Sequence, residues 1–137
     1  MRDLSFKDIS KRIDKLILPY VDLVVGVAEG GTVPASLIAH KLGVELKIIK
    51  INYRDDQNKP IYDEPVILSQ EDIINKKVLL VDDVSVSGKT METAIKILQG
   101  NLITTLTLKG KADYVLFPEI DECVNWPWKL QPKEQVV

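Results

Sequence analysis

The sequence predicts an α/β protein with a central, mostly parallel sheet flanked by helices, and with a small hood formed by the C-terminal tail. Short stretches at residues 23–27 and 77–82 have the apolar character and length of buried strands. Helical patterns follow both, and strands that alternate with helices predict a parallel sheet covered on both faces. A chain of 137 residues fits one core, so we expect a single domain over residues 1–137.

The boundaries of these elements are marked by residues with known local preferences. Ser5 and Asp8 have the spacing of a capping box, and Gly43 and Gly100 follow helical patterns. The polar stretch 54–69 is expected to be a long loop or loose hairpin that serves as a lid. The expected helices and strands, in chain order, are helix 5–18, strand 23–27, helix 34–42, strand 45–53, strand 77–82, helix 90–98, strand 102–108 and strand 113–117.

Composition excludes several classes of function. The net charge is −2 and the isoelectric point about 5.4, so a nucleic-acid partner is not expected. Cys123 is the single cysteine, which rules out a disulfide within the chain and a Cys/His zinc cluster. We expect a reducing, cytoplasmic setting. The apolar stretches are too short to cross a bilayer, and no membrane partner is expected.

The most informative stretch joins a buried strand to a helix at residues 78–90. Its sequence is Val-Leu-Leu-Val-Asp-Asp-Val-Ser-Val-Ser-Gly-Lys-Thr, which places Asp82 and Asp83 at the carboxyl end of the strand. Ligands of open α/β sheets bind at that end. A loop of small hydroxyl residues at a helix start is an anion site, so we expect a sugar phosphate whose hydroxyls contact the two carboxylates.

Two other interpretations of this stretch are weaker. Gly88-Lys89-Thr90 looks like the end of a P-loop, but that motif needs a glycine at position 83, which is Asp. Asp82 and Asp83 could instead only cap a turn, which would explain one aspartate better than two acids followed by a Ser/Gly/Thr loop.

Residues Val81–Thr90 resemble the phosphoribosyl pyrophosphate signature of type I phosphoribosyltransferases. Residues 25–35 look like the pyrophosphate loop of that family and the helix that follows it. Lys109 resembles the strand-end lysine that reads the purine 6-oxo group. Residues 112–114 and 124–128 resemble the base-binding tail of the xanthine-guanine and hypoxanthine branch.

The resemblance implies roles for individual residues. Asp82 and Asp83 would be the catalytic acids that hold the ribose hydroxyls, with Asp83 also meeting the water shell of Mg²⁺, the expected cofactor. The other substrate-binding residues implied by the resemblance are, for pyrophosphate, Glu29, Gly30 and Gly31; for the 5-phosphate, Ser85, Val86, Ser87, Gly88, Lys89 and Thr90; and for the base, Lys109, Val124 and Trp126.

Three positions depart from the 6-oxopurine pattern. Val86 stands where those enzymes usually carry an aspartate near purine N7. Glu29 replaces a basic residue beside the pyrophosphate. Cys123 replaces an aromatic residue whose stacking on a base is worth ~1–3 kcal/mol in nucleic-acid examples. These departures affect the base pocket and the pyrophosphate loop, and leave the phosphate loop intact.

The expected function is phosphoribosyl transfer from phosphoribosyl pyrophosphate to a nucleobase, a 6-oxopurine, in purine salvage. Its partners would be those substrates, the nucleoside monophosphate product and a second copy of the chain in a dimer. A phosphoribosyltransferase fold kept as a nucleotide sensor or regulator is the first alternative, favoured by Glu29 and Val86. An enzyme for adenine or a pyrimidine is the second. Lys109 argues against adenine, because an ammonium group cannot accept a hydrogen bond from a 6-amino group.

Overall fold

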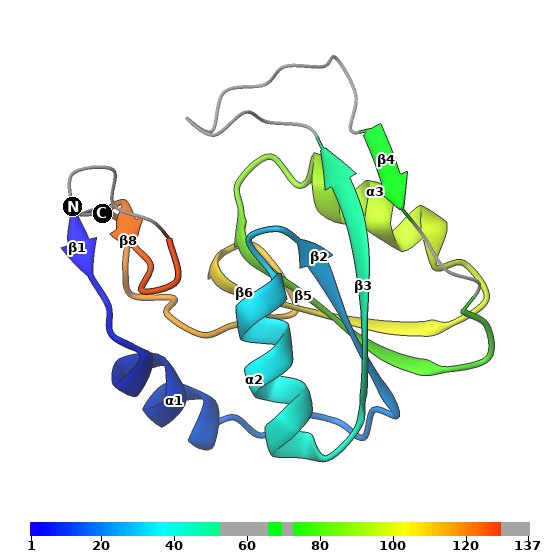
Figure 1. Ribbon diagram of the computed structural model, residues 1–137, viewed down its shortest axis with the longest axis horizontal. Helices are drawn as coiled ribbons and strands as arrows, with labels where there is room; N and C mark the ends of the chain where they lie inside the picture. Colours follow the sequence, from blue (N-terminus) through cyan, green and yellow to red (C-terminus); the bar gives the residue numbers. More distant parts are fainter. Residues whose placement is uncertain (53–65, 70–72, 130–137) are drawn as a thin grey trace, which may run out of the picture.

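A six-stranded sheet forms the centre of the computed structural model, which describes residues 1–52, 66–69 and 73–129. Its strands lie in the order β4-β3-β2-β5-β6-β7, and Figure 1 shows β4 beside β3 at one edge. The strands are β2 (Leu23–Ala28), β3 (Glu45–Asn52), β4 (Val66–Ser69), β5 (Lys77–Ser85), β6 (Leu102–Gly110) and β7 (Tyr114–Val115). All neighbouring pairs are parallel except β3 and β4, which confirms the mostly parallel sheet expected from the sequence.

Helices cover both faces of this sheet. The first face packs against α1 (Phe6–Asp14) and α2 (Thr32–Leu42) through a cluster that includes Ile13, Ile38 and Leu79. The second face packs against α3 (Lys89–Ile97) through a cluster that includes Leu80 and Ala94. Neighbouring residues of β5 are buried in different clusters, Leu79 in the first and Leu80 in the second, as expected for a central strand between two helical layers.

The predicted helix over residues 5–18 is shorter in the structure. The Ser5–Asp8 capping box is present, but α1 ends at Asp14. Leu16 and Leu18 pack against the core while Ile17 is 89% exposed, which is the alternation of extended chain rather than of a helix. The second helix begins at Thr32 rather than Pro34, because a proline in the first helical turn lacks only an N–H that the helix does not need.

Strand β5 is longer than predicted. Residues 83–85 continue the strand and pair with β6 as far as Ser85 and Gly110, instead of opening the loop. The hairpin alternative for residues 54–69 is supported by β4, which pairs antiparallel with β3. The rest of the expected lid, residues 54–65, lies outside the described part of the chain.

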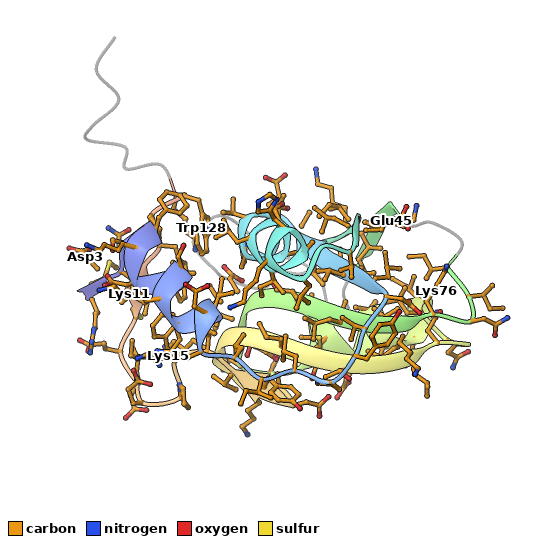
Figure 2. All side chains as sticks on the ribbon, turned by 90° about the horizontal axis from the view of Figure 1, so that it is seen from below. Asp3, Lys11, Lys15, Glu45, Lys76 and Trp128 are labelled. Carbon is orange, nitrogen blue, oxygen red and sulfur yellow. The ribbon has the colours of Figure 1, made fainter. Side chains whose placement is uncertain are left out.

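A second, two-stranded sheet forms the expected hood at one end of the molecule. Strand β8 (Val124–Asn125) pairs in parallel with β1 (Arg2–Asp3), so the hood contains the N-terminal residues as well as the C-terminal segment (Figure 1). Figure 2 shows Trp128 beside α1, where its ring lies 6.2 Å from that of Phe6. Among the described residues, no helix has the length and apolar character needed to span a membrane.

Candidate functional site

The chain changes direction across the sheet between β2 and β5. Strand β2 leads through α2 to β3 on one side, while β5 leads through α3 to β6 on the other. In open α/β sheets, ligands bind at the carboxyl ends of the strands beside such a switch point. The loops after β2 and β5 flank that point, and they contain the candidate residues Glu29–Gly31 and Val86–Gly88.

Asp82 and Asp83 lie side by side at this end of β5. The Asp82 side chain is buried, and its Oδ1 accepts a hydrogen bond of 2.8 Å from the backbone N–H of Asp83. Burial and then the neighbouring Asp83 carboxylate raise the pKa of Asp82 well above its ordinary value. Asp83 is half-buried, and its Oδ1 accepts 2.7 Å from the N–H of Val84. The pair therefore concentrates hydrogen-bond acceptors at the end of β5.

The loop after β2 contacts the end of β5 through Gly30. A Cβ placed on Gly30 would overlap the carboxylate of Asp83, so only glycine fits there without displacing that carboxylate. Gly31 is packed as closely: a Cβ added there would lie 2.6 Å from the carbonyl oxygen of Val81. The peptide bond between Ala28 and Glu29 is cis. The acid pair and the loop after β2 thus form one site, although 50 residues separate them in the chain.

Two helix N-termini meet at this edge. Helix α2 begins directly after Gly31 and α3 directly after Gly88. Gly88 has φ of 82°, a left-handed conformation that favours glycine, and Ser87 Oγ accepts a hydrogen bond of 3.3 Å from the N–H of Lys89. The unsatisfied N–H groups and dipole of each helix favour an anion at its start. The site therefore offers two anion-binding positions on either side of the carboxylates.

A hollow of about 220 Å³ opens beside the loop after β5. Lys109, at the end of β6, lines it together with Val86, which is 68% exposed. The remaining lining residues are Val84, Gly110, Phe117, Pro118, Ile120 and Asp121. The structure thus brings the sequence-predicted Lys109 and Val86 to one cavity next to the acid pair.

Val124 and Trp126 do not line this hollow. Val124 lies in β8 and packs against the core, and Trp126 is 2% exposed and stacks on Trp128 at 5.5 Å between ring centroids. The ring of Trp126 thus lies in the core and does not reach this hollow, and its role at the base stays a prediction. The segment before β8, residues 117–121, forms the wall of the hollow instead.

Sequence reasoning missed Lys50. This residue lies near the end of β3, opposite Ala28 in the register, and its Nζ is 3.2 Å from Oε1 of Glu29. Lys50 therefore brings a positive charge to the loop where the sequence placed only a carboxylate. No local motif contains both residues, so this pair could be found only after β2 and β3 were aligned in parallel.

The carboxylates fit a magnesium ion that is shared with a ligand. In the described part of the chain, no group of three or more His, Cys, Asp or Glu residues could enclose a metal. Mg²⁺, however, is commonly held by one or two carboxylates together with waters and substrate phosphates. Asp82 and Asp83 beside two anion-binding helix ends provide that donor set.

Comparison with known proteins assigns the family. The model of the phosphoribosyl transferase domain matches residues 6–129, nearly the whole chain. The chain belongs to the phosphoribosyltransferase family. Its sheet order and flanking helices are those of the type I fold. A purine phosphoribosyltransferase from Pyrococcus horikoshii superposes with a TM-score of 0.76 at 29% identity, covering 95% of each chain.

Curated relatives of this chain have different functions. An orotate phosphoribosyltransferase from Sulfurisphaera tokodaii is 31% identical over 77% of this chain and 52% of its own length. The transcriptional regulator GfcR from Methanocella arvoryzae is 33% identical over 58% of this chain and 40% of its own length. The chain thus spans about half the length of these relatives or less, and they include both an enzyme and a regulator.

Proposed function

We propose that this phosphoribosyltransferase transfers the phosphoribosyl group of phosphoribosyl pyrophosphate to a 6-oxopurine, as in purine salvage. The products would be a nucleoside 5-monophosphate and pyrophosphate. The observation that carries the proposal is the hollow with Lys109 on its wall, next to an acid pair with a helix N-terminus on each side.

The arrangement assigns one part of the substrate to each part of the site. The start of α3, with Ser85–Thr90, binds the 5-phosphate. The start of α2, with Glu29–Gly31, binds the pyrophosphate. Asp82 and Asp83 accept hydrogen bonds from the ribose hydroxyls between them. Lys109 donates a hydrogen bond to the 6-oxo group of the base in the hollow.

The reaction replaces one bond at ribose C1 with another. The C1–oxygen bond to pyrophosphate breaks, the leaving group keeps the electron pair, and a base nitrogen forms the new bond as its proton passes to solvent. The transition state has oxocarbenium character, which the carboxylates of Asp82 and Asp83 favour by charge. Holding base and sugar in contact supplies much of the rate, because it makes the step effectively unimolecular.

Mg²⁺, when bound with the substrate at Asp82 and Asp83, would neutralise the departing pyrophosphate. The proposal also includes the remaining expectations from the sequence: a single domain over residues 1–137, a homodimer and a cytoplasmic location. These rest on sequence composition and family resemblance alone.

A nucleotide-binding regulator without catalysis is the second candidate. Glu29 favours it, because a carboxylate beside the pyrophosphate position repels that anion unless Lys50 compensates. Val86 favours it as well, because its side chain cannot hydrogen-bond to N7 of a purine in the hollow. The regulator among the relatives shows that matches to this chain include a protein with a role in transcription.

One assay separates the two candidates. Guanine, hypoxanthine, xanthine and adenine are each incubated with phosphoribosyl pyrophosphate and Mg²⁺, and nucleotide product is followed. We expect product from the 6-oxopurines and much less from adenine, with Asp83→Asn as the matched inactive variant. Preference for adenine would contradict the base assignment. Binding of nucleotides without product from any base would favour the regulator.

A further inference from the structure

The hollow beside β6 has two charged groups of opposite sign on its wall. Lys109 comes from the end of β6, and Asp121 comes from the segment between β7 and β8. No ion pair or hydrogen bond joins them to each other in the described structure, so neither charge is neutralised by the other. A ligand in this hollow therefore meets a donor on one wall and an acceptor on another.

The rest of the lining suits a flat, apolar ring. Val84, Val86, Phe117, Pro118 and Ile120 contribute aliphatic or aromatic surface. The volume, about 220 Å³, is below the ~300–1,000 Å³ that is usual for drug-sized ligands. A single base fits such a space, while the ribose and phosphate would lie outside it, toward Asp83 and the start of α3.

The two charges together discriminate among 6-oxopurines. A lysine ammonium only donates hydrogen bonds, and an ionised aspartate only accepts them. Guanine has an oxo group at C6, an N–H at N1 and an amino group at C2 along one edge, so it can satisfy both residues. Hypoxanthine lacks the amino group. Xanthine has an oxygen at C2, which would face the Asp121 carboxylate.

We propose that Asp121 is a specificity-determining residue that accepts hydrogen bonds from N1 and the 2-amino group of guanine. The inference rests on the proposed function, because it requires the hollow to hold the base. It assigns the chain the order of preference guanine, then hypoxanthine, then xanthine. Because Asp121 is exposed, each of these hydrogen bonds contributes to the binding free energy only as much as a solvent-accessible charged hydrogen bond does.

Calorimetric titration of GMP, IMP and XMP into the wild type and Asp121→Asn tests the inference. We expect Asp121→Asn to lower the affinity for GMP about tenfold and to leave or raise that for XMP. Asp121→Glu, which keeps the charge, should restore part of the preference for GMP. Glu122→Gln is the matched control, because Glu122 is the next acidic residue and contacts Arg2 at 3.8 Å, not the hollow.

Ribose 5-phosphate distinguishes failure of this inference from failure of the proposed function. It lacks a base, so every variant should bind it equally. An unchanged ratio of GMP to XMP affinity in Asp121→Asn, with ribose 5-phosphate still bound, would overturn the role of Asp121 alone. If the wild type bound neither the nucleotides nor ribose 5-phosphate, the proposed function and this inference would be overturned together.

Discussion

Asp82 illustrates how a functional residue can oppose stability. Its carboxyl group is buried next to a second carboxyl, and the raised pKa reflects the cost of ionising it there. Such an arrangement benefits the protein only when a ligand supplies hydroxyl donors or a cation. We therefore regard the acid pair as a site built for binding at the expense of the free protein.

Replacing Asp82 by asparagine should separate these two effects. Asp82→Asn removes the buried charge at nearly constant shape, so the free energy of unfolding in urea should rise by about 0.5–2 kcal/mol. The same change should lower the affinity for GMP, because the ribose hydroxyls lose a charged hydrogen-bond acceptor. Lower stability in Asp82→Asn would contradict this and show that the ionised carboxylate stabilises the fold.

Glu29 and Lys50 form the second informative residue pair. Their 3.2 Å contact places the Lys50 ammonium at the loop proposed to bind pyrophosphate. Lys50→Met should therefore lower the affinity for pyrophosphate about fivefold, which is the upper range for an exposed charge contact, and should leave the affinity for GMP unchanged. Lys96→Met, on the exposed last turn of α3, is the matched control. An equal loss for GMP and pyrophosphate would mean that Lys50 acts through the fold.

Individual residues differ in how far the sequence could place them. Asp82, Asp83 and Gly88 follow one another in a local pattern, so strand, acids and helix start could be predicted together. Lys109 was placed by its position at a strand end. The ring of Trp126 could not be placed, because burial by the hood depends on α1 and β1 from the other end of the chain. Lys50 was missed for a similar reason, since its partner Glu29 lies in the loop after the neighbouring strand.

Arg12 links helix α1 to the wall of the hollow. Its guanidinium donates to the carbonyl oxygen of Leu116 at 2.7 Å, contacts Glu119 at 2.8 Å and lies 4.4 Å from the centre of the Phe117 ring. Phe117 lines the hollow. The first helix, remote in sequence from the site, thus holds a segment that lines the hollow proposed to bind the base.

The Arg12–Glu119 contact should make stability depend on pH. The hydrogen bond from Arg12 lowers the pKa of Glu119 from 4.5 to about 2. Since the pKa in the folded state is the lower one, the contact stabilises fully above pH 4.5 and is lost as the pH falls toward 2. Glu119→Gln should lower the melting temperature at pH 7 by at most a few degrees, because the pair is half-exposed. This difference should disappear near pH 2. A difference that persists there would indicate a packing effect.

Elements with a strong local pattern were predicted more accurately than those set by tertiary contacts. Strands β2 and β6 coincide with apolar runs in the sequence. Helix α2 ends at Gly43, which adopts the left-handed conformation that favours glycine. The predicted end of α1 was wrong, because the apolar pattern at Leu16 and Leu18 fits an extended segment as well as a helix. Strands β1 and β8 have two residues each, and such short pairs leave no periodic pattern to detect.

The whole molecule combines the family fold with a hollow at one edge of the sheet. The mostly parallel sheet and the helix starts after residues 31 and 88 follow from alternating strands and helices and were predictable from the sequence. The strand order, and with it the switch point, depends on how distant strands pair and was known only from the structure. The hollow was not, because its wall comes from residues 117–121, which form neither a helix nor a strand. The fold therefore carries the proposed site for a phosphorylated ribose, and the hollow carries the proposed choice of base.

Amide hydrogen exchange with and without GMP tests this account most directly, because it reports on every part of the molecule at once. We predict slower exchange in three places: the start of α2, residues 84–90, and residues 109–121 around the hollow. The apolar groove between α1 and α2, lined by Ile13, Ile17 and Leu42, should be unchanged and serves as an internal control. Slower exchange confined to that groove, or no change at residues 84–90 under saturating GMP, would contradict the account.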